Sequence, residues 1–199
     1  MLDSYPTSIA ITLSLGYLLG SIPFGLVLTK LAGLGDVREI GSGSIGATNV
    51  LRTGNKLLAL ATLALDSGKG AAATLAACYL APELAPVAAV AAVLGHLFPV
   101  WLRFKGGKGV ATMLGALAAL AWPVGLAAGL TWLVVAVIFR ISSLSSLISI
   151  SLSPAFAWYW NEPMVAIAAG VLIPFVWYRH KQNIQRLLAG EEPKIGKKN

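Results

Sequence analysis

The glycine-rich segment at residues 41–52, here called the glycine loop, has the composition of an anion-binding site: Gly-Ser-Gly-Ser-Ile-Gly-Ala-Thr-Asn-Val-Leu-Arg. Three glycines within six residues let the backbone bend so that N–H groups converge, and such nests bind anions, phosphate especially. A helix is expected to begin near Ala47 and Thr48 and to add its positive end, while Arg52 can grip phosphate through two parallel hydrogen bonds. A flexible polar turn is the alternative, but the Thr-Asn-x-x-Arg continuation favours an anion site.

A second cationic segment at residues 105–109, here called the lysine loop, reads Lys-Gly-Gly-Lys-Gly. It lacks the Gly-x-x-x-x-Gly-Lys-Ser/Thr spacing of a P-loop, so the sequence predicts no nucleotide as partner. Lys108 lies between glycines and before an expected helix start, which makes it the better phosphate ligand. Lys105 is expected mainly to anchor a helix end by extending its ammonium group to the membrane surface.

Further polar residues lie near the end of the chain. His180 and Asn183, three residues apart, are expected on one face of a terminal helix that continues the last apolar segment. Arg179 and Arg186 lie on the same side of that helix, and a basic helix that binds anionic lipid explains them equally well. Such a helix does not explain His180 together with Asn183. Ser143 is expected at the same membrane rim, so we include it in the candidate site.

Asp66 and Lys69 lie three residues apart inside an apolar segment and can pair on one helix face. Charges at membrane depth are costly and usually pair or face a cavity. A structural ion pair and a catalytic pair are both possible, and we assign Asp66, Lys69 and His96 to structural support. The two histidines are far apart without a carboxylate cluster, and Cys78 is the only cysteine. The sequence therefore predicts no metal site and no cofactor.

The composition indicates that membrane helices carry these residues. Hydrophobic residues make up 57% of the 199 residues, charged residues make up 12%, and the mean hydropathy is +0.77. Soluble domains carry about 25% charged residues, and so few charges cannot cover a water-exposed surface. The net charge of +7 could also indicate nucleic-acid binding, but basic cytoplasmic loops explain it better in a membrane chain. We predict the lipid bilayer as a partner and no nucleic acid.

Apolar segments of about 20 residues can cross a bilayer as helices. The predicted spans are approximately residues 4–29, 57–80, 84–102, 110–121, 123–139, 141–160 and 164–178. The uncharged run at 110–139 would form a helix of about 45 Å, too long for one crossing and short for two. Trp122 and Pro123 near its middle favour a break.

The distribution of charge selects two crossings for that run. With seven spans, 14 of the 15 basic residues fall on one side, and only Lys69 lies within a span. Asp3, Glu83 and Glu162 fall on the other side. Six spans would separate Arg140 from the basic tail. The positive-inside rule therefore predicts an all-α polytopic membrane protein with seven transmembrane helices, its N-terminus outside and its C-terminus cytoplasmic.

The predicted polar segments lie at one membrane face, and all of them favour anions. Their residue types indicate a substrate that carries phosphate and keeps an apolar part in the bilayer. A transporter or channel for a small phosphorylated anion is the alternative function, and it would need polar residues along a continuous path through the bilayer.

Several segments closely resemble the motifs of the PlsY family, bacterial acyl-phosphate:glycerol-3-phosphate acyltransferases. They are residues 20–25, 41–52, 65–66 with 69–70, 95–99, 104–112, and 178–180 with 183–184. The resemblance covers almost the whole chain. The chain departs from the family at Ser44, where the family usually has asparagine. Serine keeps a donor and an acceptor but has a shorter reach.

The resemblance implies transfer of a fatty acyl group from acyl phosphate to the sn-1 hydroxyl of glycerol 3-phosphate. The products are lysophosphatidic acid and phosphate, in the first acylation of phospholipid synthesis. It also implies a bacterial cytoplasmic (inner) membrane location, with the active site at the cytoplasmic face. Because an acyl phosphate is already activated, no acyl-enzyme is required. Either His180 or the leaving phosphate can take the hydroxyl proton.

The resemblance also implies the roles of individual residues. The acyl-phosphate site comprises Ser42, Gly43, Ser44, Gly46, Ala47, Thr48 and Asn49. The glycerol-3-phosphate site comprises Arg52, Lys108, Ser143, His180 and Asn183. The candidate catalytic residues are Lys108, His180, Asn183 and Ser143.

Overall fold

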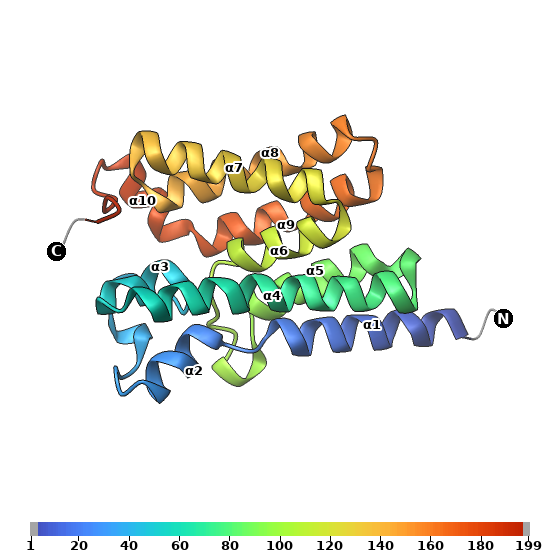
Figure 1. The fold of residues 1–199 in the computed structure, drawn as a ribbon, viewed down its shortest axis with the longest axis horizontal. Coiled ribbons are helices and arrows are strands. Elements are labelled where there is room, and N and C mark those ends of the chain that lie inside the picture. Colours follow the sequence, from blue (N-terminus) through green and yellow to red (C-terminus); the bar gives the residue numbers. More distant parts are fainter. Residues whose placement is uncertain (1–3, 197–199) are drawn as a thin grey trace.

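The computed structural model describes residues 4–196, which form α-helices and short turns without a β-strand (Figure 1). Asp3, Lys197 and Lys198, which the orientation prediction also counts, lie outside these residues. The helices are α1 (Ser4–Gly20), α2 (Phe24–Leu31), α3 (Ala47–Val50), α4 (Lys56–Leu80), α5 (Ala85–Leu97), α6 (Val110–Leu120), α7 (Trp122–Phe139), α8 (Ser142–Tyr159), α9 (Pro163–Arg179) and α10 (Lys181–Leu188).

The long helices run roughly parallel to one another, in two groups (Figure 1). Helices α1, α4 and α5 form one group, α7, α8 and α9 form the other, and α6 lies between them. Small residues allow the close approach of α4 and α6, because a side chain at Gly70 or Gly115 would collide with the backbone of the opposing helix. The main apolar core includes Val93, Met113 and Ile150.

The helix boundaries match most of the predicted apolar segments. The break predicted in the run 110–139 is present, because α6 ends at Leu120 and α7 begins at Trp122. Three helical stretches are individually long and apolar enough to cross a bilayer, and the bent pair α9–α10 makes a fourth if it counts as one span. Length and composition do not decide the number of crossings, so seven spans and their orientation stay a prediction.

Two predicted helices are interrupted. The first predicted span, 4–29, contains a break between α1 and α2 at residues 21–23, where Pro23 lacks a backbone donor. The terminal helix does not continue straight through His180, because α10 is bent by 68° from α9. The backbone N–H of His180 donates to Val176 at 3.1 Å and Trp177 at 2.9 Å. This bifurcated bond tightens the last turn of α9 and leaves His180 at the corner.

The lysine loop is set back along the bundle from the end that holds α2, α3 and α10 (Figure 1). It precedes α6, and the Thr112 carbonyl of α6 packs against Gly70 of α4. At ~1.5 Å per residue, about 20 Å of helix separates Gly70 from Lys56, where α4 begins. Helix α4 therefore extends far beyond the start of α6, and the loop is recessed below the end of the bundle that holds α2, α3 and α10 (Figure 1).

Candidate active site

Asn49 holds the glycine loop together from inside. Its side-chain Nδ2 donates to the backbone carbonyls of Val37, Ile40 and Ser44 at 2.7, 3.0 and 2.8 Å. Its Oδ1 accepts a hydrogen bond of 3.1 Å from the backbone N–H of Ser42, and the Ser42 hydroxyl lies 3.4 Å away. Asn49 is buried, and the hydrogen bonds of its amide fix the shape of the loop.

Two glycines of the loop adopt backbone conformations that other residues rarely take. Gly41 and Gly43 have φ values of 54° and 66°, in the left-handed region. A Cβ at Gly41 would also collide with the guanidinium of Arg52, so glycine lets this arginine lie against the loop. The Ser44 hydroxyl accepts a 3.4 Å hydrogen bond from the N–H of Gly46.

The glycine loop is connected to α8 through its short helix. Helix α3 begins at Ala47, as the sequence predicts, but has only four residues, so its helix dipole is small. The hydroxyls of Thr48 in α3 and Ser142 in α8 are 3.3 Å apart. The contact places the loop beside the first turn of α8, which contains Ser143.

The lysine loop is held by backbone bonds and by Arg179. The N–H groups of Gly106 and Gly107 donate to the carbonyls of Leu97 and His96 at 3.2 and 3.0 Å. The carbonyls of both glycines accept hydrogen bonds from the Arg179 guanidinium. A Cβ at Gly107 would collide with the His96 ring. This close packing fixes the backbone that carries Lys108.

Lys108 is surrounded by charges from several segments. Burial lowers the pKa of Lys108 to about 8, and the Glu192 carboxylate partly offsets that shift. The positive charges that lower the pKa further belong to Arg186, Arg52 and Arg179. Cations from the glycine loop, α9 and α10 therefore act on one ammonium group, which is mostly protonated at neutral pH.

Two residues predicted to bind glycerol 3-phosphate meet at one carboxylate oxygen. Ser143 Oγ and Asn183 Nδ2 donate to Glu192 Oε1 at 2.7 and 2.5 Å. Arg186 Nε donates to Glu192 Oε2 at 2.7 Å. The Glu192 side chain is only 7% exposed, and these three bonds keep the pKa of its carboxyl below the usual value, although burial opposes them. Donors from α8 and α10 thus form a binding site for an oxyanion.

His180 is buried at the corner between α9 and α10. Its Nδ1 is 2.8 Å from the Val176 carbonyl, so the neutral ring carries its proton on Nδ1 and presents Nε2 as an acceptor. Burial lowers the pKa of His180 to about 4, and the Lys108 ammonium contributes to the shift. The neutral imidazole can accept a hydrogen bond, but it is a weak base.

Asp66, Lys69 and His96 form a buried cluster beside the lysine loop. Lys69 Nζ lies 2.7 Å from Asp66 Oδ1 and donates to the Ile22 carbonyl at 2.6 Å. His96 Nδ1 is 3.6 Å from the same Asp66 oxygen. The cluster joins the break between α1 and α2 to α4 and α5, a geometry suited to support.

The structure brings most of the predicted glycerol-3-phosphate residues together, but the sequence analysis missed their carboxylate partner. Glu192 follows a basic helix, and the charge count alone assigns its segment to the cytoplasmic tail. The available signal is an acidic pair, Glu191 and Glu192, between Gly190 and Pro193. The sequence analysis also missed that Arg179 holds the lysine loop.

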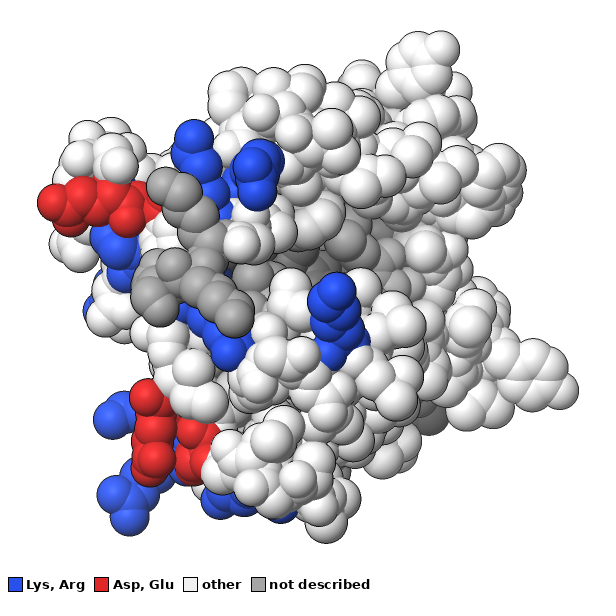
Figure 2. All heavy atoms as spheres, turned by 60° about the vertical axis from the view of Figure 1, so that its left-hand side comes forward, with Lys and Arg blue, Asp and Glu red and all other residues white. Residues whose placement is uncertain are grey.

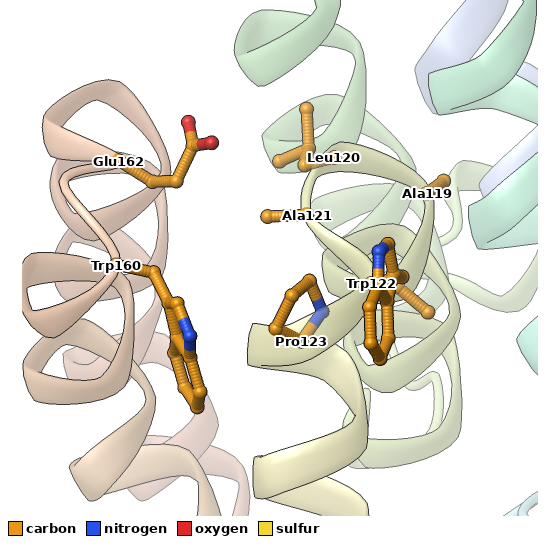
Figure 3. Close-up of a pocket in the computed structure, with 8 residues that line it drawn as sticks. Ala119, Leu120, Ala121, Trp122, Pro123, Trp160 and Glu162 are labelled. Carbon is orange, nitrogen blue, oxygen red and sulfur yellow. The ribbon is translucent and has the colours of Figure 1, made fainter.

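The two ends of the molecule differ in charge. Lysine and arginine side chains gather near the end that holds α2, α3 and α10 (Figure 2). At the opposite end a hollow lies between residues 118–123 and the α8–α9 turn, with Trp160 and Glu162 on one side and Pro123 on the other (Figure 3). Its lining contains one carboxylate and no cation. Among residues 4–196, no group of three or more His, Cys, Asp or Glu side chains could hold a metal ion.

The chain is similar to known glycerol-3-phosphate acyltransferases. Residues 10–190 match the family model described as glycerol-3-phosphate acyltransferase. A glycerol-3-phosphate acyltransferase from Paramagnetospirillum magneticum is 67% identical over 184 residues, covering 92% of both chains. One from Mesorhizobium japonicum is 58% identical over 188 residues, covering 94% of this chain and 96% of the relative.

The fold is also similar to solved structures of PlsY, an integral membrane glycerol 3-phosphate acyltransferase. Its glycerol 3-phosphate form aligns with a TM-score of 0.90 and 39% identity, covering 95% of this chain and 96% of that one. Its lysophosphatidic acid form aligns with a TM-score of 0.88 and 38% identity, with the same coverage. The described helices and these matches identify the chain as a member of the glycerol-3-phosphate acyltransferase family, with the PlsY integral membrane fold.

Proposed function

We propose that this enzyme transfers a fatty acyl group from acyl phosphate to the sn-1 hydroxyl of glycerol 3-phosphate. The observation that carries the proposal is the set of donors around Glu192, which binds an oxyanion beside Lys108. Phosphate offers the same kind of acceptor oxygens with more charge. The glycerol 3-phosphate and lysophosphatidic acid forms of the similar PlsY structures support this substrate and product.

We assign the phosphate of glycerol 3-phosphate to the donors on α8 and α10. Ser143 and Asn183 would bind its oxygens, and Lys108 would supply a compact positive charge at close range. Arg52 would reach the same phosphate from the glycine loop. The neutral His180 would accept a hydrogen bond from a substrate hydroxyl through Nε2, which would orient the glycerol part.

We assign the acyl phosphate to the glycine loop. Ser42, Ser44 and Thr48 offer hydroxyls, and α3 begins at Ala47, where the first N–H groups of a helix have no acceptor within the helix. The Asn49 amide is bonded to the loop itself. We therefore propose that Asn49 shapes this site and that the remaining predicted residues contact the donor, with Ala47 contributing its backbone.

The reaction needs positioning and charge stabilisation more than a protein nucleophile. The sn-1 hydroxyl oxygen attacks the acyl carbonyl carbon, and the bond from that carbon to the phosphate oxygen breaks. Cations around Lys108 would stabilise the negative charge that develops on the carbonyl and the leaving phosphate. Because the low pKa of His180 makes it a weak base, we propose that the leaving phosphate takes the hydroxyl proton.

The recessed lysine loop suits a substrate that is half lipid. In a seven-span arrangement with a cytoplasmic C-terminus, the charged end faces the cytoplasm of a bacterial inner membrane, and the acyl chain stays in the bilayer. Cysteine labels test this in a Cys78→Ser background. Labels at Glu83 and Glu162 should react from outside, and a label at Lys194 only from the cytoplasm. Cytoplasmic labelling at Glu162 would overturn the seven-span proposal.

The donor is tested directly with purified enzyme, glycerol 3-phosphate and EDTA, without nucleotide. Acyl phosphate, acyl-CoA and acyl carrier protein are supplied in parallel, and 1-acyl-glycerol 3-phosphate and phosphate are quantified. We expect equal amounts of both products from acyl phosphate alone. Efficient transfer from acyl-CoA or acyl carrier protein, with none from acyl phosphate, would contradict the proposal.

A further inference from the structure

The C-terminal tail folds back onto the proposed glycerol-3-phosphate site. Helix α10 ends at Leu188, and Gly190, with φ 71°, reverses the chain. Hydrogen bonds from Gly190 N–H to the Leu187 carbonyl and from Glu191 N–H to the Arg186 carbonyl complete a Schellman motif. The reversal directs the next residues towards the donors of α8 and α10.

Beyond Glu192, two hydrogen bonds between Ile195 and Arg140 fasten the tail. The N–H of Ile195 donates to the Arg140 carbonyl at 2.6 Å, and the Arg140 guanidinium donates to the Ile195 carbonyl at 3.2 Å. Arg140 caps α7 immediately before α8 begins. The tail is thus held on both sides of Glu192, which gives its carboxylate a high local concentration at the site.

The Glu192 carboxylate uses the same donors that we assign to the substrate phosphate. Its Oε1 is bonded to Ser143 and Asn183, and its Oε2 is bonded to Arg186. The Ser143 hydroxyl has one proton to donate, so a phosphate dianion cannot accept it while the carboxylate does. Two anions so close would also repel each other. Glu192 lies just beyond residues 10–190, which match the family model.

We propose that Glu192 is a tethered competitor of glycerol 3-phosphate, so that substrate binding displaces its carboxylate from Ser143, Asn183 and Arg186. The inference rests on the proposed function, because it assigns these donors to the substrate. A competitor that occupies a site for nine-tenths of the time weakens the apparent affinity of the ligand by about tenfold. Glu192 therefore sets the concentration of glycerol 3-phosphate, and of product phosphate, to which the enzyme responds.

The variant Glu192→Gln keeps the size of the side chain and removes its charge. We expect its KM for glycerol 3-phosphate to fall by about tenfold with kcat nearly unchanged, and its inhibition by inorganic phosphate to strengthen by a similar factor. The matched control is Glu191→Gln, which removes the same charge from the exposed neighbour and should leave both constants unaltered. Glu192→Asp, with a shorter reach, should fall between Glu192→Gln and the unmodified enzyme.

Calorimetric binding of inorganic phosphate separates this inference from the acyl-transfer proposal, because it needs no acyl donor. Tighter phosphate binding by Glu192→Gln supports the tethered competitor even if acyl phosphate proves to be the wrong donor. A raised KM in Glu192→Gln would show that the carboxylate binds substrate and would overturn the inference. A lower thermal stability with unchanged KM and phosphate affinity would also overturn it, because the carboxylate would then serve only to hold the tail.

Discussion

Two asparagines, Asn49 and Asn183, show that the two halves of the site are built differently. Asn49 bonds to backbone carbonyls of its own segment and keeps the glycine loop in shape. Asn183 donates to a charged side chain that arrives from the tail. A loop whose polar groups form hydrogen bonds with one another is rigid, whereas donors that bind a displaceable carboxylate form an exchangeable anion site. We therefore assign the same side chain to architecture in one half and to binding in the other.

The largest effect is expected at Lys108, where the two halves meet. Lys108→Ala removes the ammonium that the cations of both halves surround, and we expect kcat/KM to fall by about 10²–10³-fold. Lys105→Ala is the matched control in the same loop and should have a milder effect, because this exposed lysine is expected mainly to anchor a helix end. Steady-state kinetics measure both, and equal large losses would remove the distinction between the two lysines.

Asn49→Ala should disturb the glycine loop as a whole. The change removes the Asn49 donor from three carbonyls and the acceptor of the Ser42 N–H. The carbonyls of Val37 and Ile40 keep a backbone donor, whereas a buried group left unsatisfied costs about 1–3 kcal/mol. We expect faster hydrogen exchange across residues 41–52 and a KM for acyl phosphate raised by about tenfold or more. Unchanged exchange with a raised KM would instead show that Asn49 contacts the substrate.

Asn183→Ala should act on one substrate only. It removes one donor from the exchangeable site, so we expect the KM for glycerol 3-phosphate to rise by about tenfold, the value of one charge-assisted hydrogen bond. The KM for acyl phosphate and the exchange of the glycine loop should stay as they are. A comparable rise for both substrates would mean that the two halves are not separate sites.

The smallest effect concerns pH. As the pH rises through about 8, Lys108 loses its proton, so kcat/KM for glycerol 3-phosphate should decline on the alkaline side. Lys108→Arg keeps the charge at all relevant pH values. It should lower activity moderately and flatten the alkaline decline. If kcat/KM of Lys108→Arg declined with the same midpoint pH, the titration would belong to another group.

The helical segments could be predicted because local signals determine them. Glycine before Ala47, glycine before Val110 and the Trp122-Pro123 pair mark helix boundaries that the structure contains. The cations of the candidate site could be predicted from the sequence, but the contacts between its segments could not. The inward turn of Asn49, the bend at His180 and the return of Glu192 depend on contacts between distant segments, which periodicity and charge counts do not encode.

The most direct test of the central claim, that positioned charges and the substrate's own phosphate suffice for the chemistry, is the kinetics of His180→Ala. Both substrates are varied to saturation, and kcat is followed against pH. We expect the KM for glycerol 3-phosphate to rise, kcat at saturation to stay within about tenfold, and the kcat profile to keep its shape. An unchanged KM with a kcat lowered by about a thousandfold would contradict the claim and make His180 the general base.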